Sequence, residues 1–71
     1  MSKLKEFRNL HHLSQSKVAQ ECKISLRMYQ YYEADLKIPT VYIAIRLAQV
    51  LQTTVEELFP GEPPAPIYDD N

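Results

Sequence analysis

The sequence predicts an all-α fold of five short helices followed by an extended C-terminal tail. Apolar residues recur at helical spacing up to about residue 59. No stretch alternates apolar and polar residues as a half-buried strand does. A serine or threonine, the residue types preferred at helix N-caps, precedes four of the periodic segments: Ser14, Ser25, Thr40 and Thr54.

Length and composition narrow the class of protein. The 71 residues suffice for one small domain, and 45% of them are apolar, as expected for a packed core. Cys22 is the only cysteine, and His11 and His12 are adjacent, so neither provides a metal site. No apolar run is long enough for a membrane span, and the start MSKLKEF lacks the apolar middle of a signal peptide. We therefore expect a cytoplasmic protein without a metal or other cofactor.

Charge is distributed unevenly along the chain. The net charge is −1, which by itself does not indicate a nucleic-acid-binding protein. Residues 1–59 contain all eight Lys and Arg residues against six acidic residues, a net charge of +2, and residues 60–71 add three acidic residues. The predicted folded part is therefore mildly basic, which is compatible with attraction to phosphate, and the tail is acidic.

Apolar spacing and cap residues predict the first two helices. The first runs from Lys3 to about His11, with Ser2 as its cap and an apolar stripe that includes Leu4 and Phe7. The second spans residues 15–22 after the cap Ser14, and its buried face consists of Val18, Ala19 and Cys22.

The third helix spans residues 26–34 after the cap Ser25. Tyr29, Tyr32 and Glu33 share one face, and the opposite face carries Arg27, Gln30, Tyr31 and Ala34. Lys23 and Ile24 form the short turn between the second and third helices, and Ile24 is expected to fill the angle between them. The third helix therefore presents a polar face outward.

The fourth helix spans residues 41–51 after Pro39 and the cap Thr40. Its expected core stripe is Val41, Ala44, Ile45, Ala48 and Leu51. A second apolar row, which indicates deep burial or a partner, consists of Ile43, Leu47 and Val50. Thr54 and Glu57 fit a capping box before a last short helix that ends near Phe59. Four prolines from residue 60 onward favour an extended tail.

These residues resemble the Cro/repressor-type (Xre-like) helix-turn-helix family over residues 4–59. The resemblance rests on joint spacing and not on one motif. Its parts are the segments 4–8, 13–15, 18–19 and 24–25, then Glu33, Pro39, Leu47-Ala48, Leu51, Val55 and Leu58-Phe59. It implies a five-helix repressor-like helix-turn-helix domain over residues 1–59, with the third helix as recognition helix and residues 60–71 as a Pro-rich acidic tail.

The resemblance also assigns roles to individual residues. Arg8 and Glu33 match a partly buried structural ion pair of the family. Arg27 is the best candidate for a direct base contact, because its guanidinium fork pairs with guanine. Lys37 matches a phosphate contact. The complete DNA-binding set that the resemblance implies is Gln15, Ser25, Leu26, Arg27, Met28, Gln30, Tyr31 and Lys37.

Three departures from the family pattern concern glycine. The family places glycine after its second, third and fourth helices, where this sequence has Lys23, Asp35 and Gln52. A positive φ at a residue with a Cβ costs about 1 kcal/mol. Asp35 also adds an acid to a loop that would face phosphate, so DNA affinity is affected more than the fold.

The resemblance implies a sequence-specific regulator of transcription, encoded by a bacterium or phage, that binds a pseudo-palindromic operator in double-stranded DNA as a homodimer. The expected dimer interface consists of Ile43, Leu47, Val50, Val55, Phe59, Ile67 and Tyr68. The alternative is a protein-interaction module, such as an antitoxin or an accessory subunit, that uses the tyrosines at 29, 31, 32 and 42. No combination of nucleophile, base and orienting group indicates an enzyme.

Overall fold

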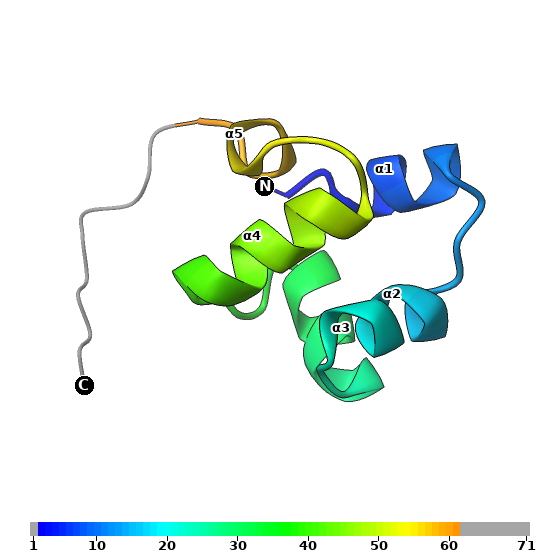
Figure 1. The fold of residues 1–71 in the computed structure, drawn as a ribbon. Helices are drawn as coiled ribbons and strands as arrows, with labels where there is room; N and C mark the ends of the chain where they lie inside the picture. The colour runs from blue at the N-terminus through cyan, green and yellow to red at the C-terminus, as the bar shows by residue number, and fades with distance from the viewer. Residues whose placement is uncertain (1, 62–71) are drawn as a thin grey trace.

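The computed structural model describes residues 2–61, which form five helices and no strand (Figure 1). The helices are α1 (Leu4–Leu10), α2 (Gln15–Cys22), α3 (Leu26–Glu33), α4 (Val41–Val50) and α5 (Val55–Leu58). The all-α, five-helix prediction is confirmed. Over the described residues no helix combines the length and the apolar character that crossing a bilayer requires. Most of the predicted tail, including Ile67 and Tyr68, lies outside the described residues.

Four of the five predicted helix caps are present: Ser14, Ser25, Thr40 and Thr54. Each cap residue has an extended backbone, and its side-chain oxygen accepts a hydrogen bond from the backbone N–H three residues later. The bonds run from Lys17 to Ser14, from Met28 to Ser25, from Ile43 to Thr40 and from Glu57 to Thr54. Because each cap stabilises its helix by about 1 kcal/mol, these residues largely determine where the helices begin.

Two predicted details of helix capping are wrong. Ser2 does not cap α1, because the N-cap position falls on Lys3 and no side chain caps this helix. The backbone N–H of Ser2 donates to Asp35 Oδ1 at 2.9 Å. The backbone N–H of Lys3 donates to the carbonyl of Leu58 at 2.7 Å, so tertiary contacts fix the start of the chain. In the capping box, the Glu57 carboxylate accepts from the hydroxyl of Thr53 at 2.6 Å in place of the Thr54 backbone.

The core lies between α4 and the helix-turn-helix pair. Helix α2 packs against both α3 and α4, while α5 packs on α4 and α1 on α3. In Figure 1, α4 crosses the middle of the molecule, and the start of the described chain, before α1, lies beside α5. The small side chains of Ala19 and Ala48 are almost fully buried, which allows the helices to approach closely. Seven larger side chains are completely or almost completely buried: Leu4, Val18, Cys22, Tyr29, Leu47, Leu51 and Leu58.

Cys22 is one of these buried side chains and forms no disulfide. Burial raises the pKa of its thiol above the ordinary value. A buried thiol of this kind is a poor nucleophile and fills space as a small apolar side chain. The predicted structural role of Cys22 is confirmed.

Helix α4 is rotated relative to the prediction. Val41 and Ile45, expected in the core stripe, are 70% and 43% exposed. Leu47, expected at a dimer interface, is fully buried in the core of its own chain and cannot form that interface. The observed core row is Ala44, Leu47, Ala48 and Leu51, at positions i, i+3, i+4 and i+7. Two neighbouring apolar rows made either rotation compatible with the sequence.

The other predicted dimer residues in the described part are half-buried. They pack against the core of the same chain, which leaves only part of each side chain for another molecule: Ile43, Val50, Val55 and Phe59. A substitution at any of them would therefore disturb the fold as well as a contact between copies.

Each of helices α1 to α4 is followed within two residues by a left-handed residue that is not glycine. Among residues 2–61, four non-glycine residues have positive φ: His12 at 58°, Lys23 at 60°, Asp35 at 62° and Gln52 at 57°. After each one, the next backbone N–H donates to the carbonyl five residues earlier, as in a Schellman motif: Leu13 to Arg8, Ile24 to Ala19, Leu36 to Tyr31 and Thr53 to Ala48. Positive φ was predicted for Lys23, Asp35 and Gln52 and was not predicted for His12, which follows the predicted end of the first helix at about His11.

Candidate nucleic-acid interface

The turn between α2 and α3 fixes the direction of α3. Three residues, 23–25, connect the helices. Lys23 adopts the left-handed conformation, and the N–H of Ile24 donates to the Ala19 carbonyl at 3.0 Å. Ile24 packs partly buried against the core, as predicted, and Ser25 starts α3. This arrangement is a helix-turn-helix unit in which the second helix is held by its neighbour and by the core.

Helix α3 has a buried face and an exposed face. Tyr29 and Tyr32 are 0% and 5% exposed and anchor the helix in the core. The burial of their rings raises the pKa of both phenols, so both hydroxyls stay neutral. Of the predicted DNA-contacting residues, five are exposed: Ser25, Leu26, Arg27, Gln30 and Lys37. Tyr31 is half-exposed, while Met28 packs partly against the core and has less surface for DNA than expected.

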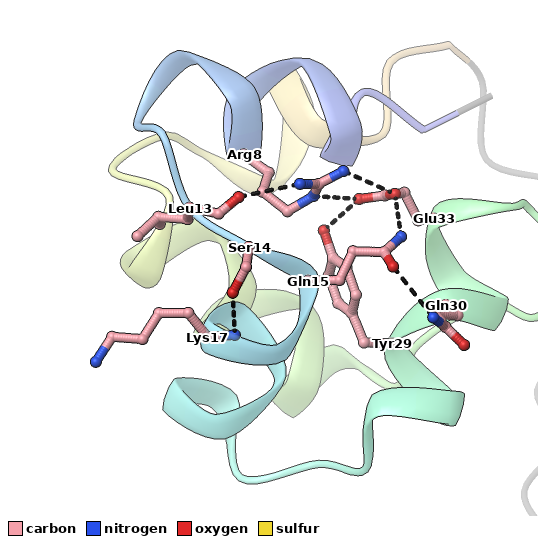
Figure 2. Close-up of polar contacts among 8 residues, drawn as sticks. All are labelled: Arg8, Leu13, Ser14, Gln15, Lys17, Tyr29, Gln30 and Glu33. Atoms are coloured by element: carbon pink, nitrogen blue, oxygen red, sulfur yellow. Dashed lines mark hydrogen bonds and ion pairs between the residues drawn. The ribbon is translucent and has the colours of Figure 1, made fainter.

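Arg8 and Glu33 form the predicted ion pair between α1 and the C-terminal end of α3 (Figure 2). Arg8 Nε lies 2.8 Å from Glu33 Oε2, and Arg8 Nη2 lies 3.2 Å from Oε1. The side chains are only 12% and 8% exposed. Arg8 Nη1 also donates to the Leu13 carbonyl at 3.0 Å. The two-pronged geometry therefore fixes α3 relative to α1 and to the segment that leads into α2.

Glu33 accepts two further hydrogen bonds. The Tyr29 hydroxyl donates to Oε2 and Gln15 Nε2 donates to Oε1, both at 2.7 Å (Figure 2). Burial acts to raise the pKa of Glu33, but the hydrogen bonds from Arg8, Tyr29 and Gln15 and the charge of Arg8 outweigh it and hold the pKa below its ordinary value. Glu33 is therefore ionised and neutralised inside the protein, although it belongs to the helix predicted to approach phosphate.

Gln15 connects this network to the exposed face of α3. Gln15 Nε2 donates to the Glu33 carboxylate, which can only accept a hydrogen bond. Gln15 Oε1 therefore points away from Glu33, and it accepts a hydrogen bond from Gln30 Nε2 at 3.1 Å. Gln15 is half-buried and lies beside Gln30 at the edge of α3 (Figure 2). Sequence reasoning missed this bond. The available signal was that Gln30 and Glu33 lie one turn apart and therefore share an edge of the helix.

Lys37 lies beyond the C-terminal end of α3 and reaches back to it. Its Nζ is 5.4 Å from the centre of the Tyr31 ring, a cation–π geometry. The predicted phosphate contact Lys37 and the predicted base contact Tyr31 are therefore close together. Arg27 lies in the first turn of α3, so the two basic side chains flank the exposed face from opposite ends. Asp35 is also exposed, but its carboxylate accepts from the Ser2 N–H.

Comparison with known proteins agrees with this geometry. The helix-turn-helix family profile matches residues 4–58, which is most of the chain. No curated protein sequence gives a significant match. Proteins of the matched family are DNA-binding regulators and are generally not enzymes. The turn at residues 23–25, the outward face of α3 and the profile match together show that the chain belongs to the Cro/repressor-type (Xre-like) family of DNA-binding helix-turn-helix regulators.

Proposed function

We propose that the protein is a sequence-specific regulator of transcription that binds double-stranded DNA as a homodimer, with α3 in the major groove. The observation that carries this proposal is the polarity of α3. Its outward face exposes Arg27 and Gln30, while its only acidic residue, Glu33, is turned inward and neutralised by Arg8. Residues 1–59 form the DNA-binding domain in this proposal, and residues 60–71 form an acidic, Pro-rich tail.

Three exposed side chains of α3 read the bases. Arg27 pairs with O6 and N7 of a guanine. Gln30 keeps its Oε1 and one N–H free after bonding to Gln15, which is the pair of groups that matches adenine N6 and N7. Leu26, 40% exposed, packs against a thymine methyl group. Tyr31 contacts a base edge or a neighbouring phosphate.

Phosphate contacts position the helix in the groove. Ser25 and the first backbone amides of α3 lie at the end of the helix where anions are favoured. Gln15 contributes from the start of α2, and Lys37 contributes from the connector after α3. Two copies place their α3 helices in successive major grooves, about 34 Å apart, on a pseudo-palindromic operator. Such a protein acts in the cytoplasm of a bacterial cell, where its own or a phage genome provides the operator.

Selection of bound duplexes from a random DNA pool, carried out at two salt concentrations, tests this function. We expect a pseudo-palindromic consensus with guanine and adenine in each half. Affinity should fall steeply with salt, because binding releases counterions from phosphates. Enrichment of no sequence at either salt concentration would contradict the proposal.

The second candidate is a protein-interaction module, such as an antitoxin or an accessory subunit. The observation that favours it is Tyr42, which is 78% exposed. Tyr29 and Tyr32, which were expected to contribute to this surface, are buried and do not. A tyrosine-centred protein contact weakens much less with salt than DNA binding does, so the same salt series separates the two candidates.

A further inference from the structure

The connector between α3 and α4 and the first half of α4 expose a concentration of large apolar side chains. We call this surface the connector patch. It consists of Leu36, Ile38, Val41, Tyr42 and Ile45, which are 69%, 77%, 70%, 78% and 43% exposed. These are five of the seven large apolar residues that are exposed within residues 2–61. The other two, Leu10 and Leu26, lie on α1 and α3.

The connector patch has a rigid support. Val41, Tyr42 and Ile45 occupy positions i, i+1 and i+4 of α4, so they lie together on the exposed side of the helix, next to its buried row. The Leu36 N–H donates to the Tyr31 carbonyl at 2.9 Å, which fixes the start of the connector. The Thr40 cap fixes its end. Little conformational entropy is therefore lost when the patch is covered by a partner.

The five side chains of the patch are uncharged. Between residues 36 and 49 the sequence has no acidic residue and two basic ones, Lys37 and Arg46. Lys37 is directed to the Tyr31 ring, and Arg46 Nη1 donates to the Cys22 carbonyl at 3.4 Å. Each cationic group thus has a contact within its own chain. An acidic partner, such as the carboxylates of the tail, would have only these two cations to bind here, and would lose hydration against the five apolar side chains.

We infer that the connector patch is the surface through which two copies of this chain associate. A second copy offers the same uncharged apolar surface, as a two-fold contact requires. From these fractions the five residues together expose on the order of 600 Å², at the upper end of the largest apolar patches on monomers. A two-fold contact that covered all of it on both copies would bury at most about 1,200 Å² in total, the lower limit for a specific interface.

This inference rests on the proposed function and deepens it. The patch begins three residues beyond the last residue of α3. A two-fold contact there therefore sets the spacing of the two recognition helices directly, without passing through α5 or the tail. It also replaces the dimer surface that the sequence predicted, whose described members are buried or half-buried in their own chain.

Sedimentation of the 71-residue chain over a range of concentrations, without DNA, tests the inference. We expect a dimer for the natural sequence and a dissociation constant about 100-fold or more weaker for Ile38→Glu and for Tyr42→Glu, because each dimer would bury two uncompensated carboxylates. Leu10→Glu is the matched control, since Leu10 is similarly exposed at 65% but lies outside the patch. Unchanged thermal unfolding verifies that each variant is folded.

Several outcomes would overturn the inference. They are unchanged association of both patch variants, equal weakening by Leu10→Glu, and a natural sequence that stays monomeric at every concentration. Association that is lost in a chain ending at Gly61 but kept in the patch variants would assign the contact to the tail. A duplex with a single half-site separates this inference from the proposed function. Tyr42→Gln, which alters the patch without adding a charge near the phosphates, should bind it as the natural sequence does, and failure of the natural sequence to bind it would count against DNA recognition alone.

Discussion

Gln15 determines the direction of the Gln30 amide. Gln30 Nε2 donates to Gln15 Oε1 at 3.1 Å, and the orientation of Gln15 is itself fixed by its bond to the Glu33 carboxylate. An interior ion pair thereby determines which hydrogen-bonding groups of Gln30 are available for the base contact that we propose. A side chain held in this way reads a base more selectively than one that is free to turn.

We expect Gln15→Leu to broaden the base preference at the position read by Gln30. The substitution leaves Gln30 in place but removes the acceptor that orients it, so the preference for adenine should fall by about tenfold or less. Competition binding with duplexes altered at single positions measures this ratio. In a Gln30→Ala background, Gln15→Leu should leave the ratio unchanged, and a further loss there would show that Gln15 acts by another route.

Arg8→Met should destabilise the protein by about 3 kcal/mol, because it leaves the Glu33 carboxylate buried without its cation. Chemical denaturation of Arg8→Met, Glu33→Gln and the double variant measures the coupling between the two residues. The double variant should lose less stability than the sum of the two single losses. Strict additivity would show that the ion pair does not couple α1 to α3.

The free energy of unfolding should decrease as pH is lowered below 4.5, the ordinary pKa of a Glu side chain. The pKa of Glu33 is lowered in the folded state, so the unfolded chain binds a proton first as pH falls. The contribution of Glu33 is therefore fully present above pH 4.5 and is lost as pH falls through the lowered value. The difference in unfolding free energy between the natural sequence and Glu33→Gln isolates this residue from the other carboxylates. A difference independent of pH would contradict the assignment.

Lys23→Gly and Gln52→Gly should each stabilise the protein by about 0.5 to 1 kcal/mol. Relief of the left-handed strain, about 1–2 kcal/mol, exceeds the cost of the greater freedom of glycine in the unfolded chain. The midpoint temperature of thermal unfolding should rise by a few degrees for a domain of this size. Lys23→Ala keeps a Cβ and should give no such gain. Asp35→Gly should gain less than either, because it also removes the acceptor for the Ser2 N–H.

Arg27→Ala and Lys37→Ala should weaken DNA binding in different ways. Loss of Arg27 should reduce the preference for the consensus by about 1–3 kcal/mol at one base position. Loss of Lys37 should weaken binding to all sequences alike and reduce the slope of log affinity against log salt by about one unit. Titrations of consensus and scrambled duplexes at several salt concentrations distinguish the two. An equal loss on both duplexes for Arg27→Ala would remove it from the base-reading set.

Local signals predicted most of the fold. The caps Ser14, Ser25, Thr40 and Thr54 act within one turn, so the sequence alone fixes these helix starts. Arg8 and Glu33 are separated by 25 residues in the sequence, so their ion pair was predicted only from the family resemblance. The rotation of α4 could not be predicted, because two adjacent rows of that helix are apolar and only packing against α2 and α5 selects Leu47 over Val41.

The candidate site was predicted less completely than the fold. Exposure of Arg27 and Gln30 followed from helical periodicity. The Gln15–Gln30 bond, the position of Lys37 over Tyr31 and the connector patch depend on how separate elements meet in space. Ser2 was predicted to be a cap from its residue type, but the helix begins one residue later than expected, with Lys3 at the N-cap. The backbone N–H of Ser2 donates instead to Asp35, which lies 33 residues away in the sequence.

The position of Glu33 also makes DNA binding sensitive to the integrity of α1. The recognition helix contains one basic and one acidic residue, and the acidic charge is cancelled by an arginine that belongs to a different helix. A molecule in which α1 has come away from α3 would present an uncancelled carboxylate next to the phosphates and would be repelled. DNA would therefore bind fully folded molecules preferentially. A chain that is damaged or unfolded at its N-terminal end would not bind the operator and would not compete with intact copies.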